Sequence, residues 1–142
     1  MVRWEDASVR WELIVPLAFL ALARPLLSIA GAYETLGGGA LGPLLVTALL
    51  AVVWVATVVL TRAPKPLVTL LLVGALYGLL AIALQQLLWN LSPGGVPEEA
   101  PSSTPVLVVS WASILATNAI WGALLGLVAA GIRRLVERRP LG

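Results

Sequence analysis

Long apolar runs alternate with short breaks of polar, proline and glycine residues along the whole chain. An α-helix needs about 20 apolar residues to cross the hydrocarbon core of a bilayer, and the longest runs reach that length. The predicted transmembrane helices cover about residues 11–36, 43–61, 67–89 and 105–132. The pattern therefore predicts an all-α integral membrane protein, with residues 1–142 forming a single domain built as a four-helix bundle.

The breaks between the predicted helices consist of residues that end helices. Residues 37–42 are mostly glycine, residues 62–66 contain two prolines, and residues 90–104 are rich in Pro, Gly, Ser and Glu. Proline lacks the amide donor that a helix interior needs, and glycine adds backbone freedom. Within the first predicted helix, Pro16 falls in the first turns, where proline is tolerated, whereas Pro25 predicts a kink near the middle.

Basic residues are distributed unevenly. Of the nine Lys and Arg residues, eight lie in the segments 1–12, 62–66 and 133–142, and only Arg24 falls inside an apolar run. Because cytoplasmic loops carry an excess of Lys and Arg, these segments are predicted to be cytoplasmic, with both termini inside and the 90–104 loop outside. Arg outnumbers Lys eight to one, and Ala, Leu and Val dominate the apolar positions. This usage favours a bacterium with a GC-rich genome, and hence a multi-pass protein of the inner (plasma) membrane.

Composition excludes several classes of function. Hydrophobic residues make up 60% of the chain and charged residues 11%, which is outside the range of soluble domains. The net charge of +2 follows from the loop arginines, so no nucleic-acid partner is expected. The chain has no Cys and no His, which removes disulfides, thiolate nucleophiles and the usual zinc and haem ligands. We therefore expect no cofactor, no metal site, no catalytic residues and no enzymatic activity.

A polar layer is the candidate binding site. At a rise of 1.5 Å per residue, Arg24 lies about 18 Å from the inner face, Thr47 about 20 Å, Asn118 about 21 Å and Gln85 about 27 Å. Each predicted helix thus contributes one polar residue to the outer half of the membrane, and the guanidinium is suited to an anionic or carbonyl-bearing group. In the alternative interpretation, Arg24 bonds carbonyls freed by the kink or extends toward the headgroups, and the amides only join helices. Trp54 is interpreted as a packing or lipid-facing residue, and Trp121 likewise.

Small residues predict how the last two helices pack. Each carries a G-x-x-x-G pair, formed by Gly74 and Gly78 and by Gly122 and Gly126. Counting from the inner boundary places Gly74 level with Gly126 and Gly78 level with Gly122. This predicts a glycine-zipped antiparallel hairpin of the third and fourth helices. The alternative turns the glycines of the last helix outward, where they would make a homodimer.

These features favour a non-enzymatic membrane protein. The segments outside the membrane are too small for a domain, Arg24 is the one basic residue inside an apolar run, and the sequence shows no catalytic constellation. The expected function is an accessory or assembly subunit that binds other membrane components, with lipids and a membrane-protein partner or a second copy as its partners. The alternative is a homo-oligomeric small transporter or channel for an anionic or polar solute, with Arg24 in its polar layer.

Overall fold

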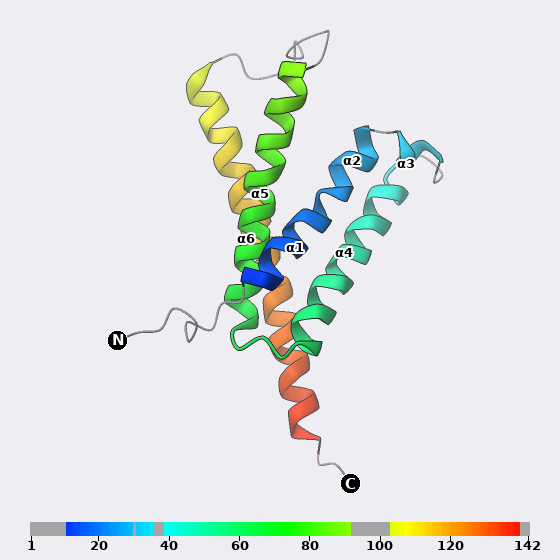
Figure 1. Ribbon diagram of the computed structural model, residues 1–142, viewed down its shortest axis with the longest axis vertical. Coiled ribbons are helices and arrows are strands. Elements are labelled where there is room, and N and C mark those ends of the chain that lie inside the picture. Colours follow the sequence, from blue (N-terminus) through cyan, green and yellow to red (C-terminus); the bar gives the residue numbers. More distant parts are fainter. Residues whose placement is uncertain (1–10, 30, 36–38, 92–102, 140–142) are drawn as a thin grey trace.

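The chain forms helices of very different lengths. The computed structural model describes residues 11–29, 31–35, 39–91 and 103–139 (Figure 1). The helices are α1 (Trp11–Ala21), α2 (Ala23–Ile29), α3 (Ala32–Thr35), α4 (Leu41–Leu60), α5 (Pro66–Leu91) and α6 (Thr104–Arg138). Four segments are long and apolar enough to span a membrane, namely Trp11–Ser28, α4, α5 and α6. The prediction of an all-helical, multi-pass membrane protein is confirmed at this level. Most of the predicted outer loop, over 92–102, lies outside the described residues.

The first span is bent one turn before its second proline. Pro25 has no amide N–H, so the carbonyl of Ala21, four residues earlier, loses its helical hydrogen bond and is crowded by the proline ring. Accordingly α1 ends at Ala21 and α2 begins at Ala23. A second interruption occurs at Gly31, whose φ of +72° lies in the left-handed region that favours glycine. The structure thus divides the helix predicted over 11–36 into α1, α2 and α3.

The most extensive helix contact joins α5 and α6. At four glycines in this contact, an added Cβ atom would lie 3.3 Å or less from the backbone of the facing helix. The glycines and the residues whose backbone they approach are Gly74 with Asn118, Gly78 with Leu115, Gly122 with Leu70, and Gly126 with Leu67. At Gly74, Gly122 and Gly126 this distance would be 2.6 Å or less, which real Cβ atoms essentially never show, so the separation of α5 and α6 there requires glycine. At Gly78 it would be 3.3 Å, a tight contact that a small shift of the facing helix relieves.

The register of α5 against α6 differs from the predicted one. Gly74 faces Asn118 rather than Gly126, a difference of eight residues along α6, or about 12 Å. The prediction assumed that α6 ends at residue 132, level with the start of α5. Instead α6 continues to Arg138, beyond the turn between α4 and α5 (Figure 1). Arginine, glutamate and leucine are good helix formers, so a change from apolar to charged residues does not end a helix.

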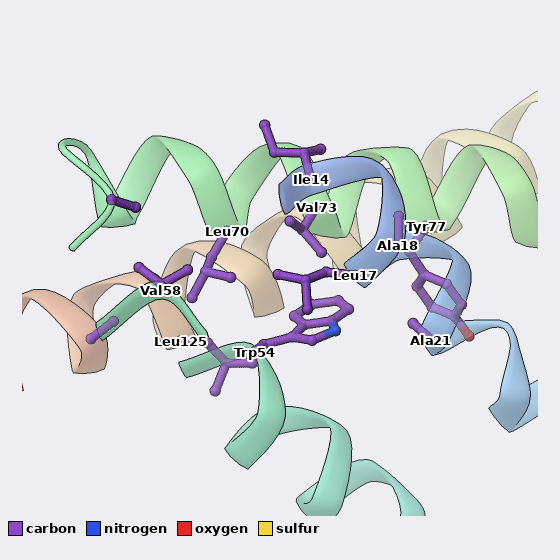
Figure 2. Packing of buried hydrophobic residues seen from close by; sticks show 12 residues of the cluster. Ile14, Leu17, Ala18, Ala21, Trp54, Val58, Leu70, Val73, Tyr77 and Leu125 are labelled. Atoms are coloured by element: carbon purple, nitrogen blue, oxygen red, sulfur yellow. The ribbon is translucent and has the colours of Figure 1, made fainter. Parts of the chain in front are cut away.

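The other two spans pack on this pair and meet at one core. α1 lies mainly against α5, and α4 lies mainly against α6. Buried side chains from all four spans fill the space between them (Figure 2). They include Ile14, Leu17 and Ala18 of α1, Trp54 and Val58 of α4, Leu70, Val73 and Tyr77 of α5, and Leu125 and Ala129 of α6. Toward the end that carries α3, α2 and α4 diverge from the α5–α6 pair (Figure 1).

The turn between α4 and α5 is tied to α6. Arg62 adopts a φ of +52° at the end of α4. The next amide, of Ala63, donates to the carbonyl of Val58 at 3.2 Å, which closes a Schellman motif. Nη1 of Arg133 donates to the carbonyl of Ala63, and Ala63 is fully buried. Nη2 of Arg133 lies 3.6 Å from a carboxylate oxygen of Glu137, so one arginine joins the turn to the basic end of α6.

Candidate functional site

A small cavity lies where the four spans meet. Its volume is about 30 Å³, which is room for about two water molecules. Its lining combines polar and aromatic side chains with small apolar ones, and every span contributes at least one residue. The lining residues are Ala21, Arg24, Thr47, Leu50, Ala51, Trp54, Tyr77, Asn118 and Trp121. We refer to it as the central cavity.

Three of the four residues predicted to form a polar layer line this cavity. Arg24, Thr47 and Asn118 come from three different spans and meet there. Gln85 does not line the cavity, and its side chain is exposed on α5. The predicted depth of Gln85, about 27 Å, already exceeded the depths of about 18 to 21 Å predicted for the other three residues. Gln85 lies eight residues beyond Tyr77, the residue of α5 that lines the cavity, which is about 12 Å along the helix.

Two of the polar groups satisfy their donors within their own helices. The hydroxyl of Thr47 donates to the carbonyl of Pro43 at 2.7 Å. Nδ2 of Asn118 donates to the carbonyl of Ile114 at 2.8 Å. Both carbonyls lie four residues earlier, which is the usual arrangement for polar side chains inside an apolar helix. The hydroxyl proton of Thr47 and one of the two amide protons of Asn118 therefore point to their own helices and not into the cavity.

The buried indole of Trp54 is the main feature that the sequence interpretation missed. The side chain of Trp54 is only 3% exposed. Its Nε1–H has no hydrogen-bond partner in the part of the chain that the structure describes. A helical spacing could have identified it, because Thr47 and Trp54 are seven residues apart and so share one face of α4. Trp121 follows Asn118 by three residues on α6 and lines the cavity for the same reason.

Charge in the cavity is positive. Arg24 is the charged residue of the described lining, and no acidic side chain accompanies it there. The side chain of Arg24 is also exposed, as is that of Trp121 at 41%, so the cavity reaches the surface of the protein beside them. Among the described residues, no three Asp, Glu, His or Cys side chains lie close enough to hold a metal ion. The arrangement is suited to binding a hydrogen-bond acceptor.

A second, larger depression lies between α4 and α6. It has a volume of about 560 Å³ and an aliphatic lining. The lining residues are Ala51, Val52, Val55, Ala56, Val59, Leu60, Leu125, Val128 and Ile132. This groove offers contact to apolar groups, whereas the central cavity offers polar contacts.

Comparison with protein-family models, with curated proteins and with solved structures finds no match to this chain.

Proposed function

We propose that this protein is a non-enzymatic accessory or assembly subunit of a bacterial inner membrane, which binds other membrane components through its outward surface. The low burial of its spans carries the proposal. In the most apolar windows of the four spans, only 11% to 28% of the residues are buried within the chain's own fold. Most of the residues in each span are therefore at least partly accessible to lipid or to another protein.

The position of Arg24 favours a protein partner in addition to lipid. This arginine lies inside the first span and lines the central cavity, yet part of it is exposed. A charged residue at the centre of a membrane helix costs roughly 2.5 to 3.5 kcal/mol on insertion scales. A polar group on a neighbouring protein lowers this cost by contacting the exposed part of the side chain. The proposed partner is thus a membrane protein, or a second copy, that presents such a group beside α2.

The glycine contact between α5 and α6 is proposed to hold the subunit together as a zipped antiparallel hairpin. All four glycines approach the backbone of the facing helix in the same chain, which supports the intrachain alternative over a homodimer through these residues. The faces of α4 and α6 that border the aliphatic groove then remain outside the hairpin.

The proposed topology places both termini in the cytoplasm. It is supported by the clustering of basic residues, because Arg62 and Lys65 lie in the α4–α5 turn that Arg133 joins to α6. The chain has no cysteine, so single cysteines can be introduced without other changes. We expect a membrane-impermeant maleimide to label Thr35→Cys on intact cells and Thr61→Cys only after lysis. Labelling of Thr61→Cys on intact cells would reverse the topology.

A transporter or channel is the second candidate, and the central cavity is the observation that favours it. The cavity gathers Arg24, Thr47 and Asn118 at the meeting point of the spans, as a solute site would. Its volume of about 30 Å³ admits about two water molecules, so one chain offers no pathway for a larger solute. This candidate therefore requires a homo-oligomer that builds the pathway between copies.

The substitution Arg24→Gln distinguishes the two candidates. The tagged wild type and the variant are isolated gently from the native membrane, and their co-purifying polypeptides are compared. For an accessory subunit, we expect a defined partner that is lost from the variant while the variant still unfolds in a cooperative transition. Loss of solute flux in liposomes, with the oligomer intact and no other polypeptide present, would instead establish the transporter.

A further inference from the structure

The central cavity contains a hydrogen-bond donor that the fold leaves unused. Nε1 of Trp54 is buried and has no partner among the described residues. Figure 2 shows the N–H edge of the indole facing Ala21 and Tyr77, and both of these residues line the cavity. A buried donor without a partner is destabilising, so a group that accepts this hydrogen bond stabilises the protein when it enters the cavity.

The residues around Nε1 of Trp54 indicate which charge the accepting group should carry. Arg24 brings a positive charge to the cavity, and the described lining contains no carboxylate. Neither Thr47 nor Asn118 accepts a hydrogen bond from the indole, since Nε1 of Trp54 has no partner in the described part of the chain, and both donate to carbonyls of their own helices. A guanidinium and an N–H donor in an apolar setting favour an anionic oxygen over a neutral one, because hydrogen bonds to ionised groups are roughly twice as strong.

The size and opening of the cavity limit how the ligand enters. A volume of about 30 Å³ takes one or two oxygen atoms and excludes a whole headgroup. Arg24 and Trp121 line the cavity and are both exposed, so the remainder of the ligand can stay outside, beside these two side chains.

We propose that the central cavity binds an oxygen of a phosphate group, with the Trp54 indole N–H as its inner donor and Arg24 as its charged partner at the opening. The phosphate belongs either to an anionic lipid or to a small soluble phosphate, since both present the same oxygen. This inference goes beyond the proposed function, because a complex with a partner protein does not require the cavity to be filled.

The indole proton of Trp54 reports directly on this contact. The full chain is labelled with ¹⁵N-tryptophan and held in maltoside micelles, which contain no phosphate, and the Trp54 signal is identified by its absence in Trp54→Phe. We expect a short-chain phosphatidylglycerol, inorganic phosphate or both to move the Trp54 signal downfield in a saturable way. The signal of Trp111, which does not line the cavity, should stay in place.

Matched reagents and variants separate the possible outcomes. A response to the lipid alone identifies a lipid phosphate, and a response to inorganic phosphate identifies a soluble one. We expect Arg24→Gln to abolish the response. Trp54→Phe lacks this signal, and its affinity for the same probe, measured by isothermal titration calorimetry, should be about tenfold or more weaker than that of the wild type, the effect of losing a hydrogen bond to a charged group. Arg134→Gln changes an exposed arginine outside the cavity and should preserve the response.

Three results would overturn the proposal. The first is a Trp54 signal that no phosphate probe moves, which would leave only water in the cavity. The second is an equal response to a short-chain diacylglycerol, which carries the ester carbonyls without the phosphate. The third is an unchanged response in Arg24→Gln. The wild-type titration needs no variant beyond the assignment, so a folding defect in Arg24→Gln does not prevent the test.

Discussion

Adding a single methyl group at Gly122 tests whether glycine sets the distance between α5 and α6. In Gly122→Ala, the new Cβ would overlap the carbonyl oxygen of Leu70 and lie 3.3 Å from Cα of Gly74. Both neighbours are backbone atoms, so a rotamer change cannot relieve the overlap. The helices must separate, and the contacts along the seam loosen with them.

The expected loss of stability in Gly122→Ala is obtained by comparison with Gly131, another glycine of α6. Forcing an extra methyl group into a well-packed contact typically costs about 1 to 3 kcal/mol. Alanine also favours the helix by about 0.5 to 1 kcal/mol relative to glycine. In Gly131→Ala the added Cβ meets nothing within 4 Å, so this variant gains only the higher helix propensity of alanine. Both variants gain that propensity, and their free energies of unfolding should therefore differ by the cost of the overlap alone, about 1 to 3 kcal/mol.

The assay is reversible unfolding in mixed micelles of maltoside and dodecyl sulfate, followed by far-UV circular dichroism. We expect Gly122→Ala to unfold at a lower fraction of dodecyl sulfate than the wild type, and Gly131→Ala at an equal or higher fraction. If Gly122→Ala is as stable as Gly131→Ala, the close approach of α5 and α6 does not exist in the folded protein and the reasoning fails.

Two further substitutions, each paired with a control, test the hydrogen bond from Arg133 and the buried side chain of Leu70 in the same assay. Arg133→Gln removes the donor to the buried carbonyl of Ala63 and should lower the free energy of unfolding by about 1 to 3 kcal/mol; Arg134→Gln, at an exposed site, should change it by less than about 0.5 kcal/mol. Leu70→Ala removes a fully buried side chain and should cost about 2 to 5 kcal/mol. The neighbouring Leu71 is 38% exposed, and equal losses for Leu70→Ala and Leu71→Ala would contradict the described core.

The four spans were predictable because the membrane imposes a simple rule. Long apolar runs must be helices there, and Pro and Gly clusters separate them, so residue type alone located each span. The break before Pro25 was also accessible, since the crowded carbonyl lies four residues before a proline. The prediction placed the kink at the proline itself and joined α2 to α3 across Gly31.

The arrangement of helices around one another was less predictable. Depth along the membrane placed Arg24, Thr47 and Asn118 at one level, and these residues do line one cavity. Gln85 was included although its counted depth of about 27 Å exceeded that of the other three residues, and it lies about 12 Å along α5 beyond the residue that lines the cavity, with an exposed side chain. Depth also carries no information on which way a helix face points, so Trp54 was equally compatible with lipid and with a cavity.

The register of the hairpin depended on a boundary that hydropathy does not give. The expected pairing of Gly74 with Gly126 treated the first arginine as the end of the last helix. Because α6 continues to Arg138, the facing residue is Asn118, eight residues away. Helix propensity, which is high for the Arg and Leu residues of this segment, was the signal that indicated a longer helix.

The central claim, that this subunit works by associating with other membrane components, is tested most directly by native mass spectrometry of the protein extracted gently from its own membranes. We expect a defined complex that contains at least one other polypeptide, together with retained lipid. A monomer without bound polypeptides would contradict the claim. A homo-oligomer that transports solute into liposomes would also contradict it, and would place Arg24 in a transport pathway.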